Sequence, residues 1–400
     1  MKIKVVCIVL LIICNTGRGL DVHASSAKDT SGIEVKRKPG DLPKFGFACE
    51  LETEPLQKLF DTPGLISDIK AMNSNISMAL IDYSPERAEI VRRLNKAGIP
   101  VIAWLVLPRE QGYYMNASNA PQSAVCFENF EKWTKKYDLK WAAVGIDVEP
   151  NIKEFGEILK AGKGKLISTL VGRSLSLKRL KRAREARKAY SKLIRHIQSR
   201  GYPVQTYQLN FVADERRINS TLLDRVIDVV TTKGDKEALM IYTSFDHESG
   251  AAAVWSYGGD AEAIILGITG GGADTASKNV PLNWNELSRD LIVASHFTKD
   301  IGIFSLEGCV QQGFLPKLKN FDWNQSVLIT GKTIEKGQKF RKMIQTILWV
   351  FTNVGYIILV LILVITWLVW RLYKRRHEER TRRIPIRPLR AQKNNHECPN

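Results

Sequence analysis

Asp147-Val148-Glu149 is the segment of this chain whose residue types and spacing best suit chemistry. On an extended strand, two carboxylates separated by one residue point the same way and lie about 6.6 Å apart, from a rise of about 3.3 Å per residue. Such crowding raises the pKa of at least one carboxyl group. A proton donor beside an ionised carboxylate is what cleavage of a glycosidic bond requires. The alternative is a structural pair held by Arg or Lys from a neighbouring loop.

Two further side chains are candidates for the same chemistry. Glu307 follows the apolar residues Phe304-Ser305-Leu306, and Tyr242 shares a strand face with Met240. A Tyr hydroxyl there can hydrogen-bond a developing charge, although a core Tyr with a satisfied hydroxyl is the alternative. Polar or aromatic residues near other predicted strand ends are candidates for substrate binding: Glu50, Asp82, Trp104, Gln208, Asn210 and Asp246.

Eight short apolar runs alternate with helical patterns and must position these residues. The predicted strands are 45–50, 77–82, 100–107, 141–149, 204–210, 238–244, 263–269 and 301–307, and the clearest helical patterns are 85–97, 177–200, 220–230 and 284–296. Strands that alternate with helices indicate βαβ units and a parallel sheet. Eight such units predict an α/β fold of the (β/α)₈ TIM barrel type. A doubly wound open sheet is the alternative.

The alternation of side chains places the candidates on particular faces. In the fourth predicted strand, Val144, Ile146 and Val148 share one face, and the two carboxylates lie on the other. In the fifth, Gln208 and Asn210 share a face. We expect the apolar face to contact the helix layer and the polar faces to point toward the barrel axis. Barrel enzymes keep their catalytic residues at the carboxyl ends of the strands.

Both ends of the chain carry targeting signals. Lys2 and Lys4 precede an apolar run, and Val22-His23-Ala24 has the pattern of a cleavage site, so we expect a signal peptide; an uncleaved anchor is the alternative. The apolar run that ends at Trp370 exceeds the roughly 20 residues that span a bilayer. The expected organisation is a signal peptide (1–24), a flexible lead (25–43), the barrel (44–325), a juxtamembrane linker (326–344), a transmembrane helix (345–370) and a basic cytoplasmic tail (371–400).

The distribution of charge indicates orientation and partners. Residues 371–400 contain ten Lys/Arg against three Asp/Glu, which predicts a single-pass cell-membrane protein with this tail in the cytoplasm and the barrel outside it. Residues 153–200 contain fifteen Lys/Arg against three Asp/Glu within a formal net charge of +18. This segment is either a solvated face or a contact for an anionic polymer or lipid. Export argues against nucleic acid.

Metal and disulfide chemistry receive little support from the sequence. Outside the two ends, the cysteines are Cys49, Cys126 and Cys309, and no pair has zinc-site spacing. The six histidines are scattered, so we predict no metal site and no cofactor. One disulfide is compatible with an oxidising compartment, but the spacing does not identify the pair.

Three segments resemble strands four, six and eight of family 18, the chitinase-type glycoside hydrolases: 145–149, 240–242 and 303–307. The resemblance implies that Glu149 is the acid, that Asp147 orients an acetamido group which acts as nucleophile, and that Tyr242 assists. Segments 147–149 and 241–244 are equally similar to the family 25 muramidases, whose later strand motifs are missing. Family 18 has further Asp residues where Gly145 and Ala142 stand, and Trp where Phe304 stands.

These observations predict a membrane-anchored, extracytoplasmic glycoside hydrolase-like protein. The resemblance implies a substrate glycan that contains N-acetylhexosamine. The alternative is a non-catalytic carbohydrate-binding or scaffold barrel at the cell surface, because acidic positions of the family motif are absent and a fold alone does not give a function.

Overall fold

Eight parallel strands close into a barrel in this protein. The computed structural model describes residues 32–151, 163–271 and 280–382. The barrel order is β2-β3-β4-β5-β6-β7-β8-β9, with each strand parallel to the next and β9 closing on β2. The strands are β2 (Lys44–Cys49), β3 (Asn75–Leu80), β4 (Val101–Leu105), β5 (Ala143–Val148), β6 (Val204–Leu209), β7 (Lys236–Tyr242), β8 (Ala263–Gly267) and β9 (Asp300–Phe304). The predicted (β/α)₈ barrel is confirmed, and the open sheet is wrong.

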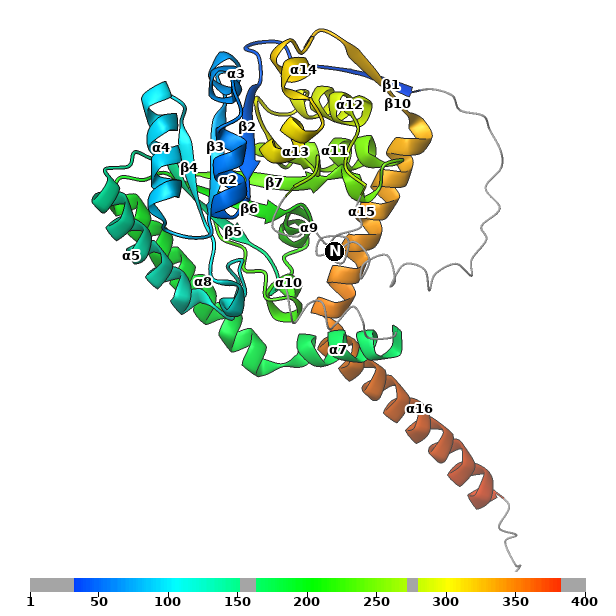
Figure 1. The fold of residues 1–400 in the computed structure, drawn as a ribbon. Helices are drawn as coiled ribbons and strands as arrows, with labels where there is room; N and C mark the ends of the chain where they lie inside the picture. Colours follow the sequence, from blue (N-terminus) through cyan, green and yellow to red (C-terminus); the bar gives the residue numbers. More distant parts are fainter. Residues whose placement is uncertain (1–31, 152–162, 272–279, 383–400) are drawn as a thin grey trace, which may run out of the picture. The chain divides into compact units, whose positions relative to one another are not determined.

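Helices surround the barrel (Figure 1). They are α2 (Thr53–Phe60), α3 (Leu65–Ala71), α4 (Pro85–Ala97), α5 (Ala120–Tyr137), α7 (Lys163–Leu175), α8 (Leu177–Ser199), α9 (Phe211–Arg217), α10 (Leu222–Val226), α11 (Gly250–Gly258), α12 (Trp284–Ser295), α13 (Leu306–Gln311), α14 (Leu315–Lys319) and α15 (Gly331–Thr352). Short 3₁₀ turns are η2 (Arg109–Gln111) and η3 (Thr243–Phe245). The predicted helix 220–230 is much shorter, since only α10 forms there.

Helix α4 illustrates why these sequences form these elements. Ser84 caps its first turn by accepting a hydrogen bond from the Arg87 backbone N–H, and Pro occupies the first helical position. Gly98 ends the helix in the left-handed conformation, at φ 75°. Between these caps, Val91 and Leu94 are fully buried against the barrel. The local signals and the apolar stripe therefore specify the same helix.

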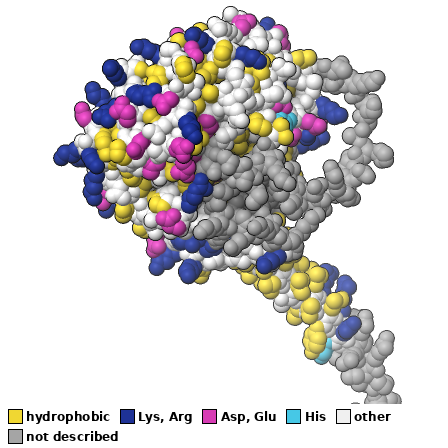
Figure 2. All heavy atoms as spheres, in the orientation of Figure 1, with side chains coloured by type: hydrophobic (Ala, Val, Ile, Leu, Met, Phe, Trp, Pro, Cys, Tyr) yellow, Lys and Arg dark blue, Asp and Glu magenta, His cyan; other side chains and the backbone are white. Residues whose placement is uncertain are grey.

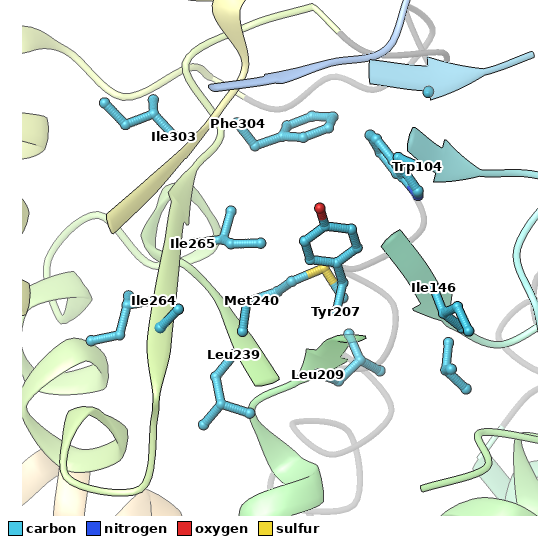
Figure 3. Close-up of a cluster of buried hydrophobic side chains, with 14 of the residues drawn as sticks. Trp104, Ile146, Tyr207, Leu209, Leu239, Met240, Ile264, Ile265, Ile303 and Phe304 are labelled. Carbon is cyan, nitrogen blue, oxygen red and sulfur yellow. The ribbon is translucent and has the colours of Figure 1, made fainter. Parts of the chain in front are cut away.

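Large side chains fill the barrel interior. Trp104, Tyr207, Met240, Ile265 and Phe304 come from five different strands and point toward one another (Figure 3). The Trp104 ring lies edge-on to Tyr207 at 6.0 Å and to Phe304 at 6.4 Å between ring centroids. Aromatic pairs in this arrangement are favourable beyond their burial. The interior is therefore a packed floor beneath the carboxyl ends of the strands.

The expected lead and linker pair with each other instead of remaining unstructured. β1 (Gly32–Lys36) runs antiparallel to β10 (Ser326–Thr330), with Gly32 opposite Thr330 and Lys36 opposite Ser326. Residues 25–31 of the expected lead and the signal peptide lie outside the described residues. The expected linker 326–344 is β10 and most of α15, so this prediction is corrected. The two segments form a small sheet that joins the two ends of the barrel domain.

Helix α15 belongs to the barrel unit. The Arg341 guanidinium donates to Asp214 Oδ1 and Asp260 Oδ2, both at 2.6 Å, and Ile344 and Leu348 are buried. Because buried ion pairs are costly to break, Arg341 fixes the helix to the barrel. Residues 345–352 of the expected span are the last two turns of α15, where Leu348 is buried and Trp349 and Val350 are exposed.

The second unit, Asn353–Asn400, contains α16 (Val354–Arg382). The most apolar 18-residue window within its stretch Val354–His377 has a mean hydropathy of 2.3, and none of that window is buried within the chain. Apolar side chains follow one another along this helix, and basic side chains gather near its end (Figure 2). One helix at the carboxyl end of the chain is thus long and apolar enough to cross a membrane.

The basic segment around α8 is only partly a solvated face. Arg179 and Arg182 both pair with the buried carboxylate of Asp228, at 2.8 Å and 2.6 Å, and Arg187 pairs with the buried Asp224. These arginines compensate carboxylates that burial would otherwise penalise. These three arginines are structural, and Arg173 and Arg200 of the same segment are also engaged, with Val226 O and Glu131.

Candidate active site

The Asp-x-Glu pair lies at the carboxyl end of β5, as the sequence predicts. Asp147 is the penultimate residue of the strand, Glu149 follows it, and their exposed fractions are 1% and 5%. The Met115 backbone extends the sheet beside this end, because its N–H donates to Asp147 O and its carbonyl accepts from Glu149 N, each at 3.1 Å. Backbone bonds thus fix the position of both carboxyl groups.

The Asp147 side chain is held in a strongly unfavourable environment for a charge. Burial raises the pKa of its carboxyl group, and the nearby carboxyls of Glu149 and Glu50 raise it further. The Trp104 indole offsets this in part, yet among the described residues neither Asp147 Oδ1 nor Trp104 Nε1 makes a hydrogen bond of ordinary geometry. Burial and the neighbouring carboxyl groups therefore favour the protonated form of Asp147.

Glu50 brings a third carboxyl group to the cluster from the first barrel strand. It follows β2 directly and is buried, and Tyr114 Oη donates to its Oε1 at 3.3 Å. Burial raises the pKa of the Tyr114 hydroxyl, and the charges of Glu50, Glu149 and Asp147 act in the same direction. Tyr114 therefore remains a neutral hydrogen-bond donor among the three carboxyls.

Tyr242 ends β7 at the same site. Its hydroxyl donates to Met240 Sδ at 3.3 Å, and its ring lies 5.7 Å from that of Phe304. Burial raises the pKa of this hydroxyl, and the charges of Glu149 and Asp147 raise it further. The weak sulfur acceptor leaves the hydroxyl able to turn to a better acceptor.

Glu307 reaches the cluster, but not from a strand. β9 ends at Phe304, Ser305 caps α13, and Glu307 lies in the first turn of that helix. Its Oε1 accepts a hydrogen bond from the Glu50 backbone N–H at 3.4 Å. The expected strand end at this position was wrong, because the Ser305 hydroxyl accepts from Gly308 N and starts a helix.

The glycine-rich segment after β8 passes directly over Glu307. Gly271 has φ 78°, and a Cβ atom on it would meet Glu307 Cγ, so no other residue fits without displacement. The charge of Glu307 also adds to the burial that raises the pKa of the Cys49 thiol. Glu307 is therefore enclosed by β2, α13 and this backbone.

Trp104 forms part of the floor of the site. It is 5% exposed, with its ring against Tyr207 and Phe304 (Figure 3). Tyr207 also bonds the Ser77 hydroxyl at 2.6 Å and occupies the space above Gly145, where an added Cβ would lie 2.8 Å from its ring. A side chain at position 145 is thus excluded by Tyr207.

Asp82 is a structural residue. Its Oδ2 accepts from the fully buried guanidinium of Arg87 at 2.8 Å and from the Thr53 hydroxyl at 2.5 Å. Burial alone would raise the pKa of Asp82, but hydrogen bonds from Arg87, Ser84 and Thr53 hold it well below its usual range. The carboxylate anchors α4, and nothing in its contacts joins it to the cluster.

Three other expected binding residues point elsewhere. Gln208 faces the helix layer, where its Nε2 donates to Thr232 O at 2.7 Å. Asn210 is in helical conformation at the start of α9. Asp246 is 57% exposed and lies 3.9 Å from Lys336 Nζ. The inward residue of β6 is Tyr207, so the expected polar face of this strand was wrong.

Tyr207 and Cys49 are the site residues that the sequence interpretation missed. The alternation in β6 offers two faces, and the more polar one was assigned to the axis. The signal for the correct face is Gly145 on the adjacent strand, since a small residue in a barrel interior indicates a large one across from it. Cys49 alternates with Phe45 and Phe47 and has no sequence signal of its own.

The arrangement combines a carboxylic acid, further carboxyl groups and neutral hydroxyl donors in one buried cluster. The crowding of Asp147, Glu149 and Glu50 favours a proton within the cluster, and the pKa values of the Tyr114 and Tyr242 hydroxyls are raised by burial and by these carboxyls, so both stay neutral donors. Such a set can protonate a leaving group, orient a polar substituent and hydrogen-bond a developing charge. Hydrolytic acid–base chemistry is what these groups support.

Comparison with known proteins gives no family. No family model and no curated protein sequence matches the chain. Similar solved structures include the glycoside hydrolase domain of PgaB (BpsB) from Bordetella bronchiseptica, at 12% identity and a TM-score of 0.41 over 70% of this chain and 98% of that chain. A GH18 chitinase from Pseudoalteromonas aurantia has 9% identity and a TM-score of 0.41, covering 69% and 99%. A putative α-L-fucosidase from Bacteroides thetaiotaomicron has 10% identity and a TM-score of 0.39, covering 79% and 98%. Similarity at this level supports no statement about the activity of this chain.

Proposed function

We propose that this protein is a membrane-anchored glycoside hydrolase that acts, outside the cytoplasm, on a glycan containing N-acetylhexosamine. Glu149 donates its proton to the leaving glycosidic oxygen as the bond from that oxygen to the anomeric carbon breaks. The acetamido oxygen of the substrate forms the new bond to that carbon, and Asp147 orients the acetamido group. Tyr242 hydrogen-bonds the charge that develops there.

The observation that carries the proposal is the cluster of Asp147, Glu149 and Glu50 at the carboxyl end of the barrel. Three buried carboxyl groups in mutual electrostatic contact destabilise the fold, because each charge opposes the others and burial opposes all of them. Strain of this kind is concentrated at functional sites. The Tyr242 hydroxyl beside the cluster supplies the remaining donor that the reaction uses.

A non-catalytic carbohydrate-binding barrel is the second candidate, favoured by the contact between Tyr207 and Gly145. Tyr207 fills the place where the family 18 motif has an Asp, and Phe304 stands where that family has a Trp. A barrel that has lost acidic positions can retain a glycan without cleaving it. Trp104 still contributes an indole to the floor of the site.

Product formation distinguishes the two candidates. The purified full chain should release reducing ends from members of a panel of N-acetylhexosamine glycans, and glycans without acetamido groups should remain intact. Binding without cleavage of any panel member would favour the scaffold.

Protease added to intact cells tests the proposed orientation. It should remove the barrel and spare a tag at Asn400; loss of the tag with the barrel protected would reverse the proposed orientation.

A further inference from the structure

Helix α7 carries apolar side chains beyond its buried stripe. Leu166 and Leu170 are buried, with exposed fractions of 2% and 6%. Ile167 and Leu175, eight residues apart, lie on one stripe beside the buried one and are 45% and 46% exposed. Leu177, at the start of the next helix α8, is 79% exposed. These side chains form an exposed apolar face that the barrel unit leaves in contact with water.

The position of α7 is fixed by contacts with the elements that end the barrel unit. Arg173 of α7 donates to Val226 O at 2.8 Å, and Arg225 donates to Ser174 O at 2.6 Å, so α7 is joined to α10. Just before α10, the Ser220 hydroxyl bonds that of Thr352, the last residue of α15, at 2.6 Å. α7 also packs directly against α15, as Figure 1 shows. The exposed apolar face thus lies beside the carboxyl end of α15.

Chain continuity places that end of α15 at the bilayer surface if α16 crosses it. The apolar stretch begins at Val354, two residues after α15 ends, and a helix rises only about 1.5 Å per residue. The last turn of α15 exposes Trp349 and Val350, at 53% and 36%. Trp prefers the interface between lipid and water. The Arg341 pairs hold α15 to the barrel, so elements beside its end share that depth.

Basic side chains flank the apolar face. Lys165 in the first turns of α7 and Lys178 at the start of α8 are exposed, and Lys181 follows one turn later with 79% of its side chain exposed. These lysines differ from Arg179 and Arg182, which buried carboxylates occupy. Lysine beside leucine and isoleucine is the pattern of helices that lie in the headgroup layer.

We propose that α7 and the first turn of α8 dock on the bilayer that α16 crosses. Ile167, Leu175 and Leu177 enter the boundary between headgroups and acyl chains, and Lys165 and Lys178 bind anionic headgroups. The inference rests on α16 being a membrane span and is independent of the proposed glycosidase activity. Docking by two elements, the span and α7, restricts the tilt of the barrel above the membrane.

Site-specific labelling of the full chain in nanodiscs tests this. Single cysteines at positions 167 and 175, in a chain whose Cys7, Cys14 and Cys398 are Ser, carry an environment-sensitive fluorophore. The nanodiscs contain phosphatidylcholine alone or an equal mixture with phosphatidylglycerol, and spin-labelled lipid is the quencher. Position 363 within α16 is the positive control. Lys96 on α4, whose neighbours are α2, α3 and β4, is the negative control.

Positions 167 and 175 should be quenched, more strongly with phosphatidylglycerol, while position 96 remains unquenched. Changing Lys165, Lys178 and Lys181 to Gln should reduce quenching at position 167 in the mixed lipid, because each basic residue near an anionic surface adds to binding. Quenching at 363 with none at 167 and 175 would overturn the docking. Absence of quenching at position 363 would show that α16 does not cross the bilayer, and would overturn the docking that depends on it. Equal quenching in both lipids would overturn the role of the lysines.

Discussion

The free energy of unfolding of the wild type should fall as pH rises because of Asp147, and replacing Asp147 by Asn should remove this fall. Burial raises the pKa of the folded Asp147 carboxyl, and Glu149 and Glu50 add to this. In the unfolded chain an Asp ionises near pH 3.9, at about its usual pKa. Between that pH and the raised folded pKa, folding takes up one proton. The free energy of unfolding therefore falls as pH rises through this window, by up to about 1.4 kcal/mol per pH unit.

Asn at position 147 has no proton to lose, so the variant lacks this slope. The difference between the free energies of unfolding of variant and wild type should widen with pH in favour of the variant. A domain of this size shifts its Tm by roughly 2 °C per kcal/mol, so each pH unit should add roughly 3 °C to the difference. The absolute offset also includes the altered contact with Trp104, so the slope is the diagnostic quantity.

Thermal unfolding of the detergent-solubilised full chain between about pH 5 and 8 measures this slope. Asp61→Asn is the matched control, because Asp61 is exposed and its carboxylate pairs with Arg93 at the surface. Titrating groups outside the cluster act equally in each protein and cancel in the comparison, so the slope reports Asp147 together with the carboxyls coupled to it. Parallel pH profiles for wild type and the Asp147→Asn protein would refute the assignment of a protonated carboxyl to this position.

Three further predictions follow from single contacts. Arg341→Ala should lower the free energy of unfolding by about 3–5 kcal/mol because it leaves the Asp214 carboxylate buried and poorly compensated. A decrease below about 1 kcal/mol in thermal unfolding would contradict the role of Arg341 in fixing α15 to the barrel. Gly145→Ala should cost about 1–3 kcal/mol through its clash with Tyr207, and Tyr207→Ala should relieve it in a double-mutant cycle, so strict additivity would argue against the contact. Tyr242→Phe should lower turnover and leave Tm nearly unchanged, since its hydroxyl bonds only a weak acceptor; equal turnover would remove its role.

The eight barrel strands and their order could be predicted because strand and helix patterns alternate along the chain, and each pattern is a local property of the sequence. Asp147 and Glu149 fall at a strand end whatever surrounds them, and the backbone bonds of Met115 then fix them. The start of α13 was missed, because the apolar run was extended to Glu307 and the cap at Ser305 was not recognised. Gln208 shows the limit, because a buried amide can be satisfied by a backbone carbonyl from a distant segment. Which of two mixed faces points inward depends on neighbours that one strand does not specify.

Long-range contacts account for the other differences. The pairing of β1 with β10 joins residues from opposite ends of the barrel domain, and the residues of each segment do not identify its distant partner. The apolar residues at the end of α15 lead into the apolar run of α16, and only Thr352, Asn353 and Gly355 interrupt them at the boundary between the two units. Arg179 and Arg182 resemble a solvated basic face until the buried Asp228 is placed beside them.

Turnover of the Glu149→Gln protein on a cleavable N-acetylhexosamine glycan tests the central claim most directly. Gln retains the shape of the side chain but cannot donate a proton as an acid does, so kcat should fall by about 10²-fold or more, in line with general acid contributions of about 10²–10⁴. Glycan binding should persist because no core volume is lost, and Tm should not fall because one of three mutually repelling carboxyls is removed. Glu128→Gln, at an exposed position of α5, should leave kcat unchanged. An undiminished kcat in the Glu149→Gln protein would contradict the proposed mechanism.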